Sequence, residues 1–123
     1  MQPAKVSPAE WEVLTVLWND SPATVPQVCT ALSEAHGWHP KTVGTFLSRL
    51  VKKGILRVKR SGRVNFYAPL ISRDDCVRAE TDSFLQRVFR GATAPMLLHF
   101  VEQADLCEDD IRELQKLLKQ KRR

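Results

Sequence analysis

The hydrophobic period of the sequence changes once between residues 40 and 68, and this change limits the folds open to the chain. The first part has the i, i+3, i+4, i+7 spacing of a helix with one buried face, formed by Val43, Phe46, Leu47 and Leu50. Gly54 closes this helix, which begins near His39-Pro40, and residues 55–59 then alternate apolar and charged side chains. A helix followed directly by a strand is therefore predicted.

The strand is predicted to continue into a hairpin. Residues 60–63 read Arg-Ser-Gly-Arg, which is the composition of a turn, and residues 64–68 form a second strand-like run. Pro69 limits this second strand because proline has no backbone N–H to donate. The expected hairpin thus carries basic residues at its tip.

Two further helices are expected before this segment, and each begins with a capping box. Ser7-Pro8-Ala9-Glu10 opens the first helix, and Thr24-Val25-Pro26-Gln27 opens the second. Their expected apolar positions are Trp11, Val13, Leu14, Leu17, Trp18, Val28, Ala31, Leu32 and Ala35. His36-Gly37 is expected to end the second helix, with Gly37 in a left-handed cap. Three helices and a basic-tipped hairpin predict a winged helix-turn-helix domain over residues 1–70.

Residues 71–123 are expected to form three more helices, so the predicted fold class is mainly α with a small β-hairpin wing. These helices carry more apolar surface than they can bury among themselves, and a second copy of the chain is the simplest partner. The predicted dimerisation residues are Phe84, Val88, Leu97, Phe100, Ile111, Leu114, Leu117 and Leu118. The alternative is that these apolar stripes fold back on the N-terminal domain of the same chain.

Positive charge is concentrated in the middle of the chain. The net charge is +5, and residues 38–63 hold eight Lys or Arg and no Asp or Glu. An acid-free basic segment on a helix and a hairpin is the electrostatic pattern of a nucleic-acid reader. The alternative is a solvated cationic face without a partner. The predicted DNA-binding residues are Lys41, Thr42, Thr45, Arg49, Lys52, Lys53, Arg60 and Arg63.

The predicted roles of the helix residues follow from the face on which they lie. Thr42 and Thr45 are expected to meet base edges in the major groove, and Lys41 and Arg49 to reach phosphate or guanine. Gly44 lies in the same outward region and has no side chain to read with. It either allows close approach of the backbone to DNA or leaves one base step unread.

The remaining basic residues are expected to contact the DNA backbone. Arg60 and Arg63 flank the hairpin turn, as a wing that reaches the adjacent backbone or minor groove requires. Lys52 and Lys53 are expected to be either phosphate contacts or solvated charges.

The sequence gives little support to catalysis or metal binding. His36 and His39 are close together but have no acidic or cysteine residue at ligand spacing beside them, and there is no Gly-rich phosphate loop, so no catalytic site, metal or cofactor is expected. The three cysteines are far apart, which favours free thiols in a reducing cytoplasm. No apolar run approaches the ~18 residues of a membrane span and no signal core is visible, so a cytoplasmic protein without direct membrane association is expected.

Several segments together suggest a known family. They are Ala9 to Leu14 with Leu17-Trp18, Trp38 to Val43, Ser48 to Leu56, Phe66 to Leu70, Leu97 to Glu102, and the region of Asp110-Ile111 and Glu113-Leu114. Their combination and order resemble the penicillinase repressor (BlaI/MecI) family over nearly the whole chain. The resemblance implies a cytoplasmic bacterial repressor with a winged-helix N-terminal domain and a helical C-terminal dimerisation domain. It also implies that the protein binds a double-stranded DNA operator with dyad symmetry.

Family members differ in how they are released from DNA, and the resemblance implies a membrane sensor and protease pathway that acts indirectly. Some members are cleaved between an Asn and a Phe, whereas this chain has His99-Phe100 at the matching position. Its tail lacks the cysteines of the copper-responsive relatives, so copper sensing is not expected. Gly44 replaces a long polar side chain, and His39 replaces a Ser cap, so the His39 ring is expected either to contact phosphate or to face water as a poor cap.

The sequence therefore predicts a homodimeric, sequence-specific transcriptional repressor that acts by occupying its operator. Two copies of the third helix would lie in successive major grooves, about 34 Å apart. The alternative from another class is a winged-helix protein-interaction module without operator specificity.

Overall fold

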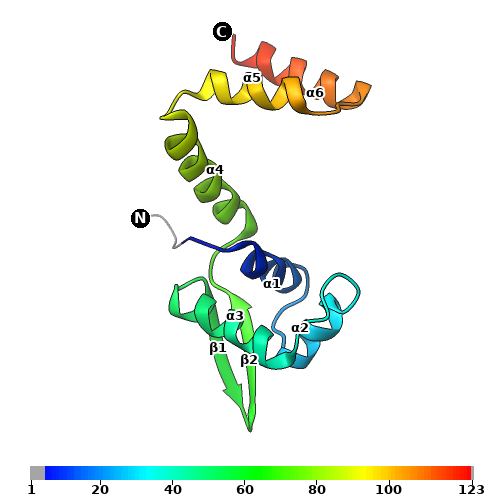
Figure 1. The fold of residues 1–123 in the computed structure, drawn as a ribbon, viewed down its shortest axis with the longest axis vertical. Coiled ribbons are helices and arrows are strands. Elements are labelled where there is room, and N and C mark those ends of the chain that lie inside the picture. The colour runs from blue at the N-terminus through cyan, green and yellow to red at the C-terminus, as the bar shows by residue number, and fades with distance from the viewer. Residues whose placement is uncertain (1–4, 123) are drawn as a thin grey trace. The chain divides into compact units, whose positions relative to one another are not determined.

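A computed structural model describes residues 5–122 of the chain, which divides into two compact units, Met1–Thr81 and Asp82–Arg123. The elements in order are α1 (Pro8–Asn19), α2 (Val25–Leu32), α3 (Pro40–Lys52), β1 (Leu56–Ser61), β2 (Val64–Pro69), α4 (Arg73–Phe89), α5 (Thr93–Gln103) and α6 (Glu108–Gln120) (Figure 1). The predicted fold class, mainly α with a β-hairpin wing, is confirmed. The division into DNA-binding residues 1–70 and dimerisation residues 71–123 concerns roles and stays a prediction.

Both predicted capping boxes form at the starts of α1 and α2. The Glu10 N–H donates to the Ser7 hydroxyl at 3.1 Å, and the Ser7 N–H donates to the Glu10 carboxylate at 2.9 Å. Thr24 and Gln27 make the same reciprocal pair, at 3.3 and 2.9 Å. Local sequence therefore sets where these two helices begin, because each box satisfies backbone donors that the first turn leaves free.

The predicted end of α2 is wrong. The helix stops at Leu32, before His36-Gly37, and Gly37 is not one of the described glycines with positive φ. The His36 ring makes two contacts in the segment that follows the helix. The His36 ring stacks on Trp38 with centroids 4.3 Å apart, and its Nε2 lies 3.0 Å from the Glu12 carboxylate.

The three N-terminal helices pack around one apolar core with the base of the hairpin. Its most deeply buried members are Val13, Leu14, Leu17, Val28, Val43, Leu47, Leu50, Ile55 and Leu56. Each such side chain contributes about 2 kcal/mol by leaving water. Trp11 and Trp18 pack edge to face beside this core, whereas Ala31 and Ala35, which were predicted to be apolar core positions, are exposed.

The hairpin is tighter than predicted. Ser61 pairs with Val64, so the turn consists of Gly62 and Arg63 alone. Gly62 has φ +63° at the first turn position, which a residue with a Cβ rarely adopts. The tighter turn extends both strands and carries the basic tip beyond the helices of its unit (Figure 1).

A short backbone bridge, which the sequence did not predict, ties the hairpin to the segment between α1 and α2. The Ala23 N–H donates to the Tyr67 carbonyl at 3.0 Å, and the Tyr67 N–H donates back at 2.8 Å. Ala23 and Tyr67 are both buried, so this bridge joins the wing to the core.

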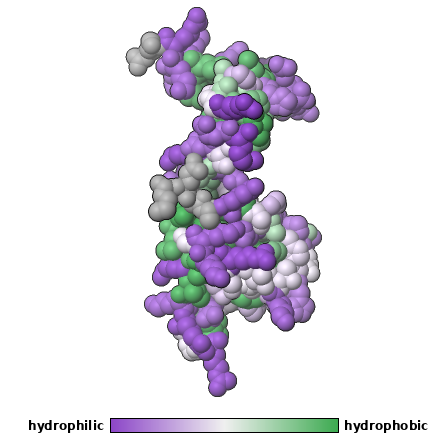
Figure 2. Space-filling model, turned by 60° about the vertical axis from the view of Figure 1, so that its left-hand side comes forward, coloured by the Kyte–Doolittle hydropathy of each residue, from purple (hydrophilic) through white to green (hydrophobic). Residues whose placement is uncertain are grey.

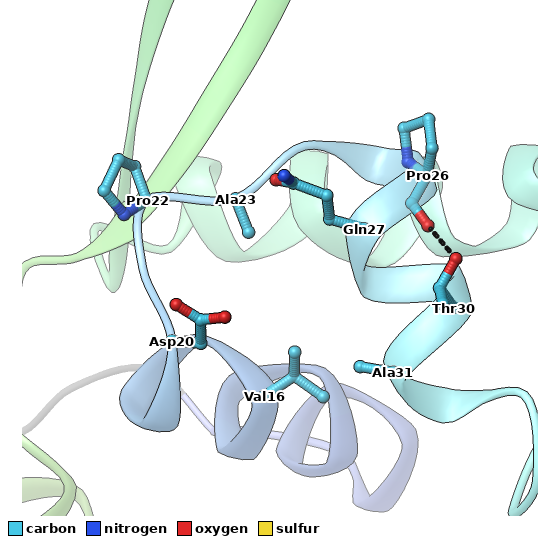
Figure 3. A pocket seen from close by; sticks show the side chains of 8 residues that line it. All are labelled: Val16, Asp20, Pro22, Ala23, Pro26, Gln27, Thr30 and Ala31. Atoms are coloured by element: carbon cyan, nitrogen blue, oxygen red, sulfur yellow. Dashed lines mark hydrogen bonds between the residues drawn. The ribbon is translucent and has the colours of Figure 1, made fainter.

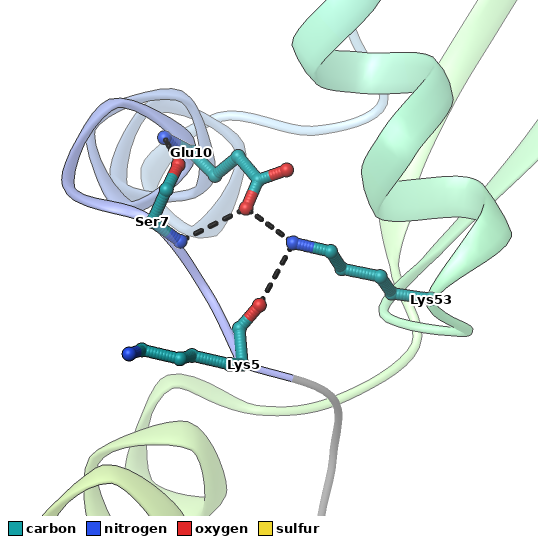
Figure 4. Close-up of polar contacts among 4 residues, drawn as sticks. All are labelled: Lys5, Ser7, Glu10 and Lys53. Carbon is teal, nitrogen blue, oxygen red and sulfur yellow. Dashed lines mark hydrogen bonds and ion pairs between the residues drawn. The ribbon is translucent and has the colours of Figure 1, made fainter.

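A buried ion pair joins the start of α1 to the end of α3 (Figure 4). The Lys53 Nζ lies 2.6 Å from the Glu10 carboxylate and donates to the Lys5 carbonyl at 2.7 Å. Only 2% of the Glu10 side chain and 28% of the Lys53 side chain are exposed. Burial alone raises the pKa of Glu10, but hydrogen bonds from Lys53 and Ser7 and the Lys53 charge bring the pKa below its ordinary value of 4.5.

The second unit has much less interior. Met96 is its one buried hydrophobic residue among those described. Phe84 of α4 and Phe100 of α5 stack with centroids 5.8 Å apart. Arg90 and Gly91 have positive φ and end α4, and the Gly91 N–H bonds back to the Leu85 carbonyl at 3.1 Å. In the described part of the chain, no helix is both long and apolar enough to cross a membrane.

The Glu10–Lys53 pair predicts a large and pH-dependent loss of stability when Lys53 is removed. Lys53→Met should lower the free energy of unfolding by about 3 kcal/mol at neutral pH, because it leaves a buried carboxylate unpaired. Because the pKa of Glu10 is lower in the folded than in the unfolded protein, its ionised carboxylate stabilises the fold at pH values above the unfolded-state pKa. This contribution is lost as the pH falls through the folded-state pKa. Chemical denaturation should therefore show a smaller difference between variant and wild type at about pH 3.

Lys52→Met is the matched control, because Lys52 is exposed at the same helix end. It should change the free energy of unfolding by less than about 0.5 kcal/mol. Equal losses in the two variants would contradict the assigned role of Lys53.

Candidate nucleic-acid interface

The outer face of α3 is polar, basic and open. Val43, Leu47 and Leu50 are fully buried on the opposite side of the helix. The exposed residues of the outer face are Lys41, Thr42, Thr45, Ser48, Arg49 and Lys52. A surface hollow follows this face, and Tyr67 of β2 also lines it. The structure therefore brings together the helix residues predicted to bind DNA, except Lys53.

Hydrogen bonds within the helix hold the first turn of α3. His39 is the N-cap, and its Nδ1 accepts the Lys41 N–H at 3.0 Å. The expectation that His39 is a poor cap is therefore wrong, because the imidazole nitrogen replaces the hydroxyl of a Ser cap. The Thr45 hydroxyl donates to the Lys41 carbonyl at 3.0 Å. The Thr45 side chain can therefore offer its methyl group and the lone pairs of its oxygen to a binding partner, but not its hydroxyl hydrogen.

Gly44 lies between these residues, on the edge of the hollow. A Cβ built on Gly44 would meet nothing within 4 Å, so no contact inside the protein requires glycine there. Glycine in a helix interior is unfavourable relative to alanine by about 1 kcal/mol. The two expectations for Gly44, close approach of a ligand or an unread base step, stay predictions.

The hairpin supplies a second basic surface. Arg60 and Arg63 are exposed at its tip, and the Arg60 Nε donates to the Gly62 carbonyl at 3.0 Å. Arg57 and Lys59 are also exposed, and their i, i+2 spacing places them on one face of β1. Sequence reasoning omitted these two from the site, although they lie in the acid-free stretch and the strand alternation was visible.

Lys53 is placed differently from the other predicted contacts. Its ammonium is bound to Glu10 and to the Lys5 carbonyl, as described above. Lys52, one residue earlier, is exposed and takes part in no ion pair within the described residues. The phosphate contact of Lys53 stays a prediction, and the structure gives this residue a role inside the domain.

No carboxylate neutralises the basic face among the described residues. The ion pairs of the first unit join His36 to Glu12, Lys53 to Glu10, and Arg78 to Asp75. The basic side chains of the outer α3 face and the hairpin are absent from these pairs, so their charges are available to an anion. A row of unpaired cations on a helix and a hairpin suits the phosphate backbone of a duplex.

The predicted dimerisation residues lie on the second unit, and Figure 2 shows hydrophobic surface among polar side chains there. Val88, Leu97, Phe100, Ile111, Leu114, Leu117 and Leu118 are all exposed, by between 37% and 60%. Phe84 is half-buried against Phe100. Exposed apolar side chains in such number are typical of a surface that a partner covers.

A second hollow lies between α1 and α2, near Pro22 (Figure 3). Two of its polar side chains are used locally, since the Thr30 hydroxyl donates to the Pro26 carbonyl at 3.0 Å and Gln27 belongs to the capping box. The described residues contain no cluster of His, Cys, Asp or Glu that would hold a metal ion. The arrangement of charge thus favours the α3 face as the functional site.

Comparison with known proteins gives consistent matches. The profile of the penicillinase repressor family matches residues 6–120. The penicillinase repressor of Bacillus licheniformis is 38% identical over 116 residues, 94% of this chain and 91% of that protein. The methicillin resistance regulatory protein MecI of Mammaliicoccus sciuri is 32% identical over 117 residues, 95% of each chain. The structure of monomeric Bacillus licheniformis BlaI in complex with the blaP half-operator matches with a TM-score of 0.52 and 40% identity, covering 60% of this chain and 90% of that chain.

The open space at Gly44 predicts that alanine is tolerated there. Gly44→Ala should raise the free energy of unfolding by up to about 1 kcal/mol, because alanine favours the helix and its methyl group meets no neighbour. Gly54→Ala is the contrasting control, since Gly54 has φ +79° and alanine there should lose about 1 kcal/mol. Chemical denaturation measures both, and a loss at Gly44 equal to that at Gly54 would contradict the placement.

Proposed function

The chain belongs to the penicillinase repressor family, and we propose that it is a bacterial transcriptional repressor that binds duplex DNA as a homodimer. The observation that carries the proposal is the exposed, acid-free basic face of α3 and the hairpin. The structure of BlaI in complex with a half-operator, which matches 60% of this chain at 40% identity, supports the same assignment.

The dimensions of α3 suit the major groove. An α-helix with its side chains is about 10–12 Å across, and the groove is about 12 Å wide. We propose that Thr42, Thr45 and Arg49 meet base edges, while Lys41 and Lys52 bind phosphates. The rigid first turn that the His39 cap provides would present these side chains without a large ordering cost.

The hairpin would contact the DNA backbone beside the groove. Arg60 and Arg63 at its tip are the proposed wing contacts, and Arg57 and Lys59 add positive charge along the same strand pair. Lys53 would reach a phosphate only by leaving Glu10, so the proposed surface rests on the other basic residues.

Residues 71–123 are proposed to form the dimer, through the exposed apolar side chains of α4, α5 and α6. A two-fold dimer would present two copies of α3 to half-sites about 34 Å apart on one face of the duplex. Repression would follow from occupancy, because a bound dimer excludes polymerase from the same DNA. In this role the protein is cytoplasmic and performs no catalysis.

Replacing Arg49 tests the base-reading face. Arg49→Ala should weaken binding to a duplex site selected from the source genome by about 1–3 kcal/mol if the guanidinium contacts a base or a phosphate in a bidentate way. Fluorescence anisotropy across a salt series measures the affinity and its salt dependence. Arg78→Ala is the matched control, because Arg78 is exposed on α4 and paired with Asp75.

The same titration distinguishes the repressor from a protein-interaction module. A repressor should prefer its selected site over random duplex, and its affinity should fall steeply with salt. Equal affinity for all sequences, or no binding at low salt, would overturn the proposed function.

Replacing Leu118 tests the dimer. Leu118→Asp places a charge on a side chain that is 60% exposed in the single chain, so the fold should tolerate it while the dimer loses at least about tenfold in affinity. Analytical ultracentrifugation measures the change, with Asn65→Asp on the exposed hairpin as control. An intact dimer would remove Leu118 from the interface and favour another covering for α6.

A further inference from the structure

One buried carboxylate of the first unit makes fewer hydrogen bonds than it could. The Glu10 side chain is 2% exposed, and its Oε1 accepts the Ser7 N–H at 2.9 Å and the Lys53 ammonium at 2.6 Å. Its Oε2 is buried and has no hydrogen-bond partner among the described residues. A buried oxygen without a partner destabilises a fold, so this carboxylate is an unfavourable way to join two helices by stability alone.

Two other considerations separate the charge of Glu10 from the needs of the fold. Burying both charges of an ion pair opposes much of their attraction, and apolar side chains of similar size often stabilise a fold as well. The capping box of α1 does not require a charge either, because glutamine also serves at this position. Gln27 takes that place in the box of α2. The charge on Glu10 is therefore better explained by where it holds Lys53.

The ion pair lies one helical turn from a proposed base-reading residue. Lys53 follows the last residue of α3, and its backbone N–H donates to the Arg49 carbonyl at 2.9 Å. Lys53 thus binds the last turn of α3 through its backbone and the first turn of α1 through its side chain (Figure 4). Arg49 and Lys52 lie in that last turn of α3, and both are exposed.

The other polar side-chain contacts of α3 are local. His39 caps its first turn, and the Thr45 hydroxyl donates to the Lys41 carbonyl four residues earlier. Within the part of the chain that the structure describes, the Lys53 ammonium makes the one side-chain hydrogen bond from α3 and its caps to another helix. Apolar packing also holds α3 against the core, but it is not directional. A directional contact at this end fixes the helix more narrowly than packing alone.

We propose that Glu10 and Lys53 are positioning residues for DNA reading, which hold the last turn of α3 where Arg49 meets a base edge. Neither side chain touches DNA in this role. The proposal rests on the DNA-binding function proposed above, and it replaces the predicted phosphate contact of Lys53 with a contact inside the protein. Hydrogen bonds to base edges require placement to within about 0.5 Å, whereas attraction to phosphates acts over a longer range. Loss of the pair should therefore lower sequence discrimination more than general affinity for DNA.

Glu10→Gln in the full-length chain tests the proposal, because glutamine keeps the capping box and removes the charge. Fluorescence anisotropy measures the affinity for a duplex site selected from the source genome and for random duplex. The ratio of the two affinities should fall about tenfold, as expected when one base contact is lost. The salt dependence should stay as in the wild type, because no phosphate contact is removed.

Glu12→Gln is the matched control. It removes the same charge from the same helix, but Glu12 pairs with His36 instead of Lys53. Its ratio of affinities should equal that of the wild type. An unchanged ratio in Glu10→Gln, or an equal fall in both variants, would contradict the proposal.

A double variant separates positioning from stability. Lys53→Met alone leaves the Glu10 carboxylate buried without a cation, whereas Glu10→Gln combined with Lys53→Met leaves no charge at this place. The double variant should recover much of the denaturation midpoint that Lys53→Met loses, while its ratio of affinities stays as low as in Glu10→Gln. If the ratio recovers together with the midpoint, the pair only stabilises the fold and the proposal is wrong.

A phosphate contact of Lys53 would give opposite results. Glu10 would then compete with DNA for the ammonium, so Glu10→Gln would raise the affinity for both duplexes. Lys53→Met would also reduce the slope of the salt dependence by about 1. Either result overturns the proposal and leaves the proposed function intact. If the wild-type protein binds the selected site no better than random duplex, the proposed function itself fails.

Discussion

The ion pair between Glu10 and Lys53 is the constraint on which the geometry of the first unit depends. Glu10 is fixed by the capping box of α1, and Lys53 follows the last residue of α3, so their contact at 2.6 Å sets how these two helices meet. One carboxylate oxygen accepts both the Ser7 N–H and the Lys53 ammonium, which couples the start of α1 to the end of the proposed reading helix. A buried ion pair adds little net stability compared with apolar packing, but it tolerates few geometries. Here the pair joins the start of α1 to the end of α3.

The parts of the fold that the sequence predicted are those set by local physics. Capping boxes and apolar periodicity located the starts of α1, α2 and α3, because the groups involved lie within one or two helical turns. The missed features join residues that are far apart in sequence. The Glu10–Lys53 pair spans 43 positions, and the Ala23–Tyr67 bridge and the His36–Glu12 contact depend on how the helices pack. Nothing in the local pattern distinguished Lys53 from Lys52, although their surroundings differ completely.

The same distinction applies to the candidate site. Burial of Val43, Leu47 and Leu50 fixes which side of α3 faces outward, so the sequence was sufficient to predict an exposed basic face. It was not sufficient to say what each polar atom does, because hydrogen bonds within the protein compete for the same groups. The His39 ring caps the helix, and the Thr45 hydroxyl donates to its own backbone. Both hydrogen bonds form without a ligand, and a group that is ordered before binding loses less entropy when it binds.

The two units carry surfaces with different proposed roles, one for DNA and one for a second copy of the chain. This difference suggests why the units are joined in one chain. A single winged domain offers a few phosphate and base contacts, so its affinity for DNA is modest and falls as salt rises. Linking two such domains makes the second binding event intramolecular, which raises the overall affinity by about 10² to 10⁴ without any new contact to DNA. Exposed leucines on α6 disfavour the isolated chain in water, and a partner helix removes that penalty. The exposed apolar side of α6, which is unfavourable in water when the chain is a monomer, would thus drive dimerisation. Because dimerisation depends on the concentration of the protein, the affinity for the operator would depend on it as well.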